Sequence, residues 1–182
     1  MDELVVVTGV ESLAASRGPA SVRRLPAPAD ALLHPVALLA LAVMVVNDHL
    51  LKHAWPGVLT GKLSDFAGLV VFPLFLLGSV EVVQWLAGRW RGPDQRVLSV
   101  LVVATVVVFA LAKTVPAANA LYAATWGFLQ WLPSAAANSL AGAAVPAAWH
   151  VRLVADPTDL ICLPAALIPL WIGRRRAASA SG

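Results

Sequence analysis

Two pairs of charged residues stand at helical spacing beside long apolar runs, and their types suit chemistry on a charged ligand. Lys62 and Asp65 lie three apart in TGKLSDFAGLVVFPLFLL (60–77), and Asp156 and Asp159 lie three apart before another apolar run. Residues three or four apart share a face of a helix. A carboxylate can act as a base or bind a cation, and an ammonium group can hold a phosphate or carboxylate. We therefore treat these residues as a candidate site.

More polar residues fall at the same boundary of the apolar segments. Asp48 and Lys52 are four apart, Asn47 precedes them, and Lys113 follows another apolar run. We predict catalytic roles for Lys62, Asp65 and Asp159. We predict ligand-binding roles for Asn47, Asp48, Lys52, Lys113 and Asp156. The motifs SDFAGL (64–69) and TDLICL (158–163) also share a pattern, which is consistent with a repeated helix pair.

These residues have a second interpretation, in which they only cap or anchor helices. Ser64 and Asp156 suit N-cap positions, Pro157 suits a first helical position, and Asp159 suits the third position of a capping box. Lysine side chains near a helix end can extend to lipid head groups. An ionised side chain inside hydrocarbon costs about 2.5–3.5 kcal/mol on insertion scales, so it should be paired or hydrated. The gathering of charged pairs at one boundary favours a site.

The composition indicates that a membrane protein positions these residues. Of 182 residues, 59% are hydrophobic and only 13% are charged, and the mean hydropathy is +0.79, whereas soluble domains have about 25% charged residues. We predict an all-α polytopic transmembrane bundle with four firm spans. The spans run from about His34 to Leu51, from Asp65 to about Ala87, from Val97 to Ala112, and from Leu160 to Ile172. The last span is short unless its helix begins at Asp156.

Residues 117–150 are apolar, but Pro, Gly and Asn interrupt them. They could form two short spans, a re-entrant hairpin about Pro133, or helices in the membrane interface beside Trp126, Trp131 and Trp149. We predict a broken helical pair between the third and fourth spans. In each case the pair leaves the sidedness of the later chain unchanged.

The basic residues predict the orientation of the chain. Nine of the ten arginines fall on three alternate segments, whereas all three lysines and Arg152 fall on the other side. By the positive-inside rule, both termini and the 88–96 loop are cytosolic, in an inner or plasma membrane. We divide the chain into a flexible cytosolic leader (1–30), one transmembrane domain (31–176) and a disordered tail (177–182). Glu81 is expected to form an ion pair with the arginines of the 88–96 loop.

Several function classes lack their sequence signatures. The chain has no GxSxG motif, no glycine-rich phosphate loop and no nucleic-acid module, and orientation accounts for its net charge of +3, so we predict no nucleic-acid partner. His49 and His53 have the spacing of two zinc ligands, but no HExxH glutamate accompanies them, and we predict no metal site. Cys162 lies among apolar residues and is expected to be a core residue.

The order of the charged motifs resembles that of the VanZ-like family of small bacterial membrane proteins. In that family D-K-x-x-H-F opens one helix and D-x-x-x-N-x-x-G opens a later one; Lys62, Asp65, Phe66, Asp156 and Asp159 stand in corresponding places. No histidine precedes Phe66, and apolar residues replace the later Asn and Gly. The resemblance implies a bacterial envelope protein from a family known for glycopeptide resistance.

Three function classes stay open. The first is binding or processing of an anionic lipid or cell-envelope precursor at the extracytoplasmic boundary. The second is transport or binding of an ion, and the third is a structural subunit without a site. Membrane lipid is the expected partner in all three.

Overall fold

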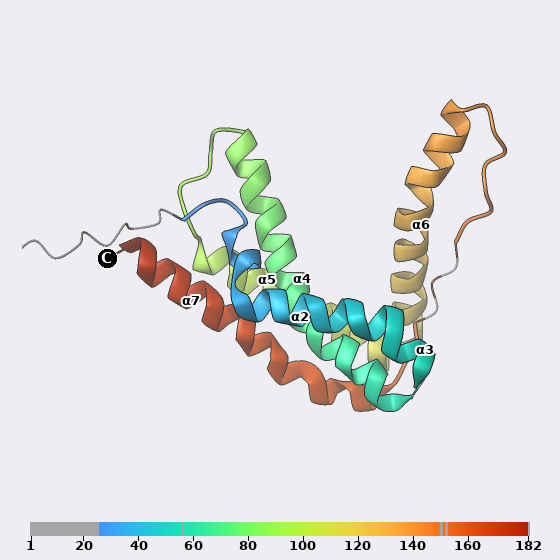
Figure 1. The fold of residues 1–182 in the computed structure, drawn as a ribbon, viewed down its shortest axis with the longest axis horizontal. Coiled ribbons are helices and arrows are strands. Elements are labelled where there is room, and N and C mark those ends of the chain that lie inside the picture. The colour runs from blue at the N-terminus through green and yellow to red at the C-terminus, as the bar shows by residue number, and fades with distance from the viewer. Residues whose placement is uncertain (1–25, 56, 150, 152, 182) are drawn as a thin grey trace, which may run out of the picture.

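The computed structural model describes residues 26–55, 57–149, 151 and 153–181, and these residues form helices and connecting segments without a β-strand (Figure 1). In chain order the elements are η1 (Asp30–Leu33), α2 (Pro35–Val46), the π-helix η2 (Asn47–Leu51), α3 (Lys52–Ala54), α4 (Val58–Leu86), α5 (Gln95–Thr114), α6 (Pro116–Leu140), the 3₁₀-helix η3 (Pro157–Ala166) and α7 (Leu167–Ser181). The predicted all-helical class is confirmed. Residues 1–25 of the predicted leader lie outside the described residues.

Three helical segments are long and apolar enough to cross a membrane, and they coincide with the first three predicted spans. They are Pro35–Ala54, Val58–Leu86 and Gln95–Thr114. The second begins at Val58, so the predicted start at Asp65 is wrong. The Thr60 hydroxyl accepts a hydrogen bond from the Gly57 N–H and donates one to the Gly57 carbonyl, which completes the first turn. Ser64 therefore lies inside α4 and does not cap it.

The last predicted span consists of two helical pieces in the structure. Asp156 caps η3, as predicted, because its carboxylate accepts a hydrogen bond from the Thr158 N–H at 2.9 Å. The first ten helical residues, which include Pro164, are 3₁₀-helical, and only then does α7 begin. Neither piece is among the helices that qualify as spans. The predicted disordered tail is wrong over 177–181, because α7 continues to Ser181.

In residues 117–149 the predicted broken helical pair is not confirmed, because a single helix continues through Pro133, the position of the predicted re-entrant alternative. Helix α6 runs through Pro133 and ends at Leu140. Gly142, two residues later, has a φ of 67°, which fits the left-handed conformation that glycine favours after a helix. The chain then returns along α6 without helical structure, and the Trp131 indole donates a hydrogen bond to the Pro146 carbonyl at 2.8 Å. Figure 1 shows α6 standing away from α2 and α7. Alanine, the residue with the highest helix propensity, recurs in α6 on both sides of Pro133.

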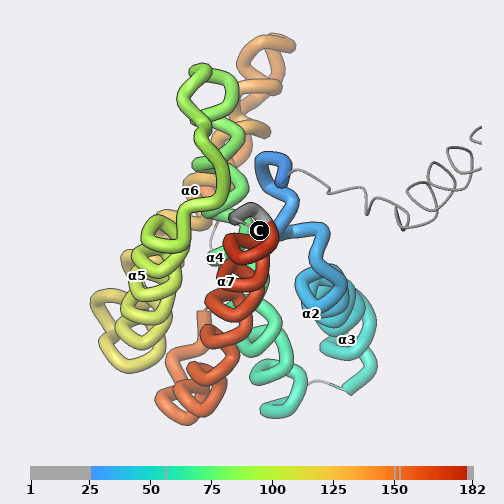
Figure 2. Tube along the Cα trace, turned by 90° about the vertical axis from the view of Figure 1, so that its left-hand side faces the viewer, coloured from blue at the N-terminus to red at the C-terminus, as the bar shows by residue number. Residues whose placement is uncertain are grey.

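Helix α4 lies at the centre of the bundle, between α2 on one side and α5 on the other (Figure 2). Its residues Leu74 and Leu77 pack with Leu98 of α5 and Ile172 of α7 in one buried cluster. Many large apolar side chains outside this cluster are exposed, including Val100 and Val103 of α5. An apolar exterior over long apolar helices is expected for a protein surrounded by lipid.

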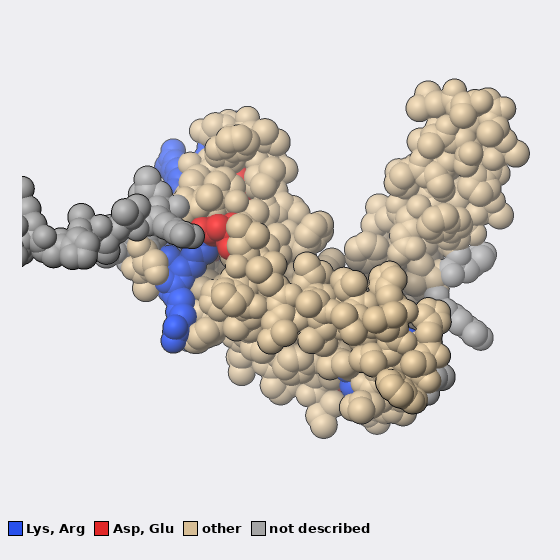
Figure 3. All heavy atoms as spheres, in the orientation of Figure 1, with Lys and Arg blue, Asp and Glu red and all other residues tan. Residues whose placement is uncertain are grey.

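On the face shown in Figure 3, basic and acidic side chains gather near the C-terminal end, and only small patches of basic atoms are visible toward the other end of the long axis. Near the C-terminal end, Arg176 of α7 contacts Glu81 of α4 and Asp30 of η1. Gly173 of α7 lies against Gln95 at the start of α5, because an added Cβ would come 2.6 Å from the Gln95 side-chain oxygen. The segments predicted to share one side of the membrane therefore meet at one end of the bundle.

Candidate functional site

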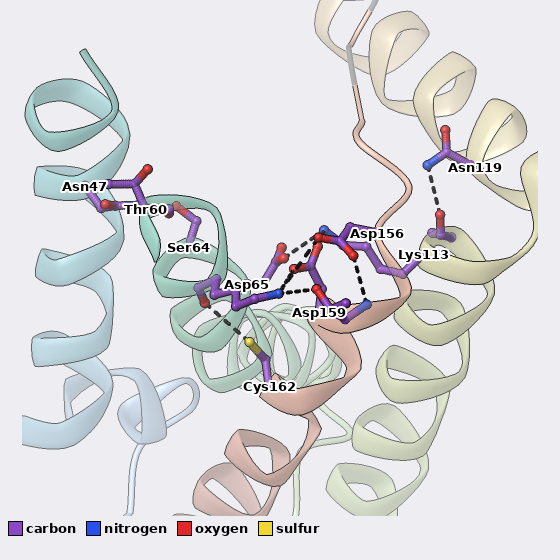
Figure 4. Close-up of polar contacts among 12 residues, drawn as sticks. Asn47, Thr60, Ser64, Asp65, Lys113, Asn119, Asp156, Asp159 and Cys162 are labelled. Atoms are coloured by element: carbon purple, nitrogen blue, oxygen red, sulfur yellow. Dashed lines mark hydrogen bonds and ion pairs between the residues drawn. The ribbon is translucent and has the colours of Figure 1, made fainter. Parts of the chain in front are cut away.

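The charged residues at the other end form a continuous network between α4, α5 and η3. Figure 4 shows Asp65, Lys113, Asp156 and Asp159 gathered at this junction. The Lys113 ammonium lies 2.7 Å from one oxygen of Asp65 and 2.7 Å from one oxygen of Asp159. The second oxygen of Asp159 lies 2.7 Å from the Lys62 ammonium. We call Lys62, Asp65, Lys113 and Asp159 the lysine cluster.

The lysine cluster is buried at its centre and open at its rim. The side chains of Lys113 and Asp159 are 7% and 9% exposed, whereas that of Lys62 is 24% exposed. Lys62 also donates a hydrogen bond to the Thr158 hydroxyl at 2.7 Å, and its ammonium lies 3.9 Å from Asp156. An ammonium group has three N–H donors. Within the described residues, the hydrogen bonds of Lys62 to Thr158 and Asp159 use two of them, which leaves one for a ligand at the rim.

The local sequence explains how three elements deliver these side chains. Lys62 and Asp65 are three apart on α4 and share its face toward η3 and α5. Lys113 comes from the last turn of α5. The cap of η3 by Asp156 fixes the first turn that carries Thr158 and Asp159. Nearby, the Asn119 amide of α6 donates a hydrogen bond to the Ala112 carbonyl at 2.8 Å, which joins the start of α6 to the end of α5.

A second polar network lies between α2 and α4. The Asn47 amide donates hydrogen bonds to the Thr60 carbonyl and the Ser64 hydroxyl, each at 2.6 Å. The Ser64 hydroxyl donates to Asp48 at 2.5 Å, and Asp48 pairs with Lys52 at 2.7 Å. Asn47 is fully buried, and within the described residues its side-chain oxygen has no hydrogen-bond partner. The π-helix η2 carries Asn47 and Asp48 and places them against the face of α4 that contains Thr60 and Ser64.

The predicted site residues therefore separate into two groups. The structure confirms that Lys62 and Asp65 converge with Asp156 and Asp159, and it adds Lys113 to the same network. The other predicted ligand-binding residues, Asn47, Asp48 and Lys52, belong to the network with α2, and within the described residues none of them forms a hydrogen bond or ion pair with the lysine cluster. Their predicted membership of one site is not supported by these contacts, because their partners lie toward α2.

Sequence reasoning missed the hydroxyl groups that connect these charges. Thr158 accepts from Lys62, and Ser64 joins Asn47 to Asp48. The signal was present, since both residues are the first letter of the motifs SDFAGL and TDLICL. The second letters, Asp65 and Asp159, both contact Lys113. The sequence similarity of the two motifs thus corresponds to two carboxylates that share one ammonium group.

Asp156 is the most accessible carboxylate beside the lysine cluster. The Thr158 side chain, followed by the Thr158 backbone N–H, lowers the pKa of Asp156 below its ordinary value. The Thr158 hydroxyl therefore joins the helix cap to Lys62. Within the described residues, no three His, Cys, Asp or Glu side chains are arranged to hold a metal ion.

A further charged cluster lies at the opposite end of the bundle. Arg176 donates hydrogen bonds to both carboxylate oxygens of Glu81, at 2.5 and 3.0 Å, and one to the Ala27 carbonyl at 2.7 Å. Its Nε contacts Asp30, and Glu81 also accepts from the Ala29 N–H. We call Arg176, Glu81 and Asp30 the arginine cluster. The predicted pairing of Glu81 with the 88–96 loop is wrong, because η1 and α7 enclose Glu81 and supply its partners.

Comparison of this chain with models of protein families, with curated proteins and with solved structures finds no match. The resemblance to the VanZ-like family stays a prediction that rests on its short motifs.

Proposed function

We propose that this is a multi-pass membrane protein that binds the anionic phosphate group of a lipid or lipid-linked envelope precursor at the lysine cluster. The observation that carries the proposal is the position of Lys62, a partly exposed ammonium with a spare donor at the rim of a buried charge network. The apolar helices beside it supply a surface for the acyl or prenyl chains of such a ligand. The roles of Asp65 and Asp159 as catalytic residues stay predictions.

Burial of charge supports a functional role over a purely structural one. Buried ion pairs stabilise proteins weakly, because desolvation offsets their attraction, and well-packed apolar residues often do better. Here Lys113 and Asp159 are almost completely buried at the end of an apolar bundle. Small polar caps would join these helices at lower cost, so we infer that the charges serve binding.

The charge balance of the cluster specifies how an anion would bind. Two lysines face three aspartates when Asp156 is included, so the group carries one excess negative charge. An incoming phosphate is repelled unless a carboxylate moves away or takes up a proton. Asp156 is the carboxylate at the rim, 3.9 Å from the Lys62 ammonium. Because Thr158 lowers the pKa of Asp156, we expect Asp156 to stay charged at neutral pH, and binding to strengthen only as the pH falls through that lowered pKa.

Thermal unfolding of the purified protein in detergent tests the proposal. Phosphatidic acid and a polyprenyl monophosphate should raise the melting temperature more than phosphatidylcholine does, and inorganic phosphate distinguishes headgroup binding from lipid binding. Lys62→Gln should weaken the affinity for the phosphate lipid about tenfold, as expected for loss of a charged hydrogen bond, and the shift in melting temperature should be smaller. Lys52→Gln is the matched control, because Lys52 is at the same end but pairs with Asp48.

Each outcome of this experiment is decisive. Equal responses of the two variants, or no response to any phosphate lipid, would overturn the proposal. Stabilisation by cations in place of phosphates would favour the ion-binding alternative.

We also propose that the arginine end is cytosolic and the lysine end extracytoplasmic, because nine arginines occupy segments that the positive-inside rule places inside. Cysteine labelling in a Cys162→Ala background tests this orientation. An impermeant reagent applied from outside should label Ala155→Cys beside the lysine cluster but not Arg91→Cys in the loop. Both positions are exposed, and Arg91 avoids the left-handed φ of 111° at the adjacent Gly92. Labelling of Arg91→Cys from outside would reverse the orientation.

A further inference from the structure

The arginine end of the bundle contains a cavity of about 330 Å³ with charged walls of opposite sign. Arg175 and Arg176 of α7 line it, and Asp30 of η1 lines it as well. His34 and Ser179 supply further polar groups, and Leu33 supplies an exposed apolar side chain. A mixed lining of this kind fits an amphipathic ligand.

The positive wall is provided by Arg175 and not by Arg176. Arg176 is occupied by Glu81, Asp30 and the Ala27 carbonyl. Among the described residues, Arg175 makes no ion pair, and its guanidinium lies over the Trp171 ring at 4.4 Å from the ring centre. Stacking fixes the guanidinium plane while its N–H donors stay available. Arg175 is therefore prepared to bind a phosphate.

His34 adds a second donor to the same cavity. Its Nδ1 accepts a hydrogen bond from the Val36 N–H at 3.2 Å. In a neutral imidazole the other ring nitrogen then carries the proton. The His34 ring also packs edge-on against Trp171, with ring centres 5.4 Å apart, so Trp171 holds both His34 and Arg175.

The negative wall is provided by Asp30. Two carboxylates, Asp30 and Glu81, share the single guanidinium of Arg176, which leaves one excess negative charge. The Asp30 side chain is 29% exposed, whereas that of Glu81 is 3% exposed. The Oδ1 of Asp30 is buried against Arg176, and its Oδ2 accepts a hydrogen bond from the Ala27 N–H at 3.0 Å, so Oδ2 is the oxygen that a ligand can reach. A ligand that matches both walls carries a phosphate and a cation.

We infer that this cavity binds the headgroup of a phosphoethanolamine lipid, with its phosphate at Arg175 and its primary ammonium at Asp30. The headgroup is electrically neutral overall, as are the two walls taken together. Leu33, 70% exposed beside the cavity, and the apolar surface of α2 provide contacts for the acyl chains. This inference concerns the end opposite the lysine cluster and does not depend on the proposed function.

Lipid titration of the full chain in detergent, read by native mass spectrometry and thermal unfolding, tests the inference. Phosphatidylethanolamine should bind more tightly than phosphatidylcholine, whose quaternary ammonium has no N–H donor for Asp30. It should also bind more tightly than phosphatidylglycerol, which has no cation. Soluble phosphoethanolamine distinguishes recognition of the headgroup from binding of the whole lipid.

Two neighbouring arginines provide matched variants. Arg175→Gln should weaken phosphatidylethanolamine binding about tenfold, because it removes a charged donor. Arg174→Gln removes the same charge from an exposed position that does not line the cavity and should leave binding unchanged. Equal loss in both variants would overturn the inference in favour of diffuse charge attraction. Preference for phosphatidylglycerol would overturn it in favour of a simple anion site.

A second substitution at Arg175 distinguishes loss of the guanidinium group from misfolding of the Arg175→Gln variant. Arg175→Lys keeps the charge but replaces the planar fork, so it should retain the fold while binding the lipid more weakly than the parent. Parent-like lipid binding by both Arg175→Lys and Arg175→Gln would refute the inference.

Discussion

The arginine cluster and the lysine cluster both bury charge in an apolar bundle, but their hydrogen bonding differs. Arg176 makes three hydrogen bonds and an ion pair with groups from α4, η1 and the segment before it. At the lysine cluster, each ammonium makes two contacts at 2.7 Å, and Lys62 lies at an open rim. The N–H donors of Arg176 are thus nearly all used, whereas each lysine of the lysine cluster retains one N–H donor.

This difference separates a structural joint from a candidate site. The planar guanidinium of Arg176 forms a bidentate pair with Glu81, and such pairs specify geometry as well as supplying energy. The joint fixes residues 27–30 against α4 and α7. An ammonium group is a compact charge with rotatable donors, so Lys62 can exchange one partner for another. A ligand at the lysine cluster is therefore expected to bind Lys62, whereas at the arginine end Arg176 is occupied and the donors available to a ligand belong to Arg175.

The largest effect is expected from breaking the arginine cluster. Glu81→Ala should destabilise the protein by about 3–5 kcal/mol, because Arg176 then stays buried without its main partner. Chemical unfolding in detergent micelles measures this change. The control is Arg174→Ala, at an exposed position of α7, the helix that carries Arg176. It should change stability by less than about 0.5 kcal/mol. A parent-like Glu81→Ala would show that the joint contributes nothing to stability.

A smaller effect is expected at the centre of the lysine cluster. Lys113→Met should destabilise the protein by about 3 kcal/mol, because Asp65 and Asp159 lose a shared charged partner. Asp159 keeps Lys62, and Asp65 is 19% exposed, so some solvation remains.

The control for this substitution is Lys52→Met, whose exposed pair with Asp48 contributes little. If Lys113→Met destabilises the protein more than Glu81→Ala does, the lysine cluster would be the structural joint, contrary to our assignment.

The sequence predicted the helical class and four spans, because apolar runs of this length have few alternatives in lipid. Three of the four coincide with helices that are long and apolar enough to cross a membrane. The sequence also predicted the convergence of Lys62 and Asp65 with Asp159, since charges at the boundary of apolar helices need partners. These inferences depend on composition and on short-range spacing, which a single sequence displays.

The errors arose where tertiary contacts decide the structure. Helix α6 passes through Pro133, where a re-entrant hairpin was one of three predicted alternatives, and it ends at Leu140 before the left-handed Gly142. Glu81 pairs with Arg176, which is 95 residues away, in place of the nearer loop arginines. The division of Asn47 from the lysine cluster depends on which face of α4 meets α2. Helical spacing alone does not specify these faces.

The comparison of joint and site is sharpened by a substitution that keeps shape but removes charge. Asp159→Asn should keep the fold but weaken stabilisation by a phosphate lipid, because Asp159 holds both lysines in place and this loss should outweigh the removal of one excess negative charge. A ligand at a hundred times its dissociation constant adds about 2.7 kcal/mol to the parent. Thermal unfolding with and without lipid measures the difference. Retention of the full lipid response would show that Asp159 does not support binding.

The smallest effect is expected at Asp156, which tests whether the cap and the site are separable. Thr158 lowers the pKa of Asp156 in the folded protein, so the charged form contributes stability above its ordinary pKa of 3.8. That contribution is lost as the pH falls through the lowered folded pKa. Asp156→Asn caps a helix about as well and does not titrate. Its melting temperature should match that of the parent at neutral pH and fall less on acidification, whereas Asp156→Ala should melt at a lower temperature at neutral pH.

Because Asp156→Asn also removes a negative charge 3.9 Å from Lys62, it should bind a phosphate lipid more tightly than the parent. Weaker binding would mean that Asp156 holds the ligand through its charge, and the lysine cluster would then favour a cation over a phosphate.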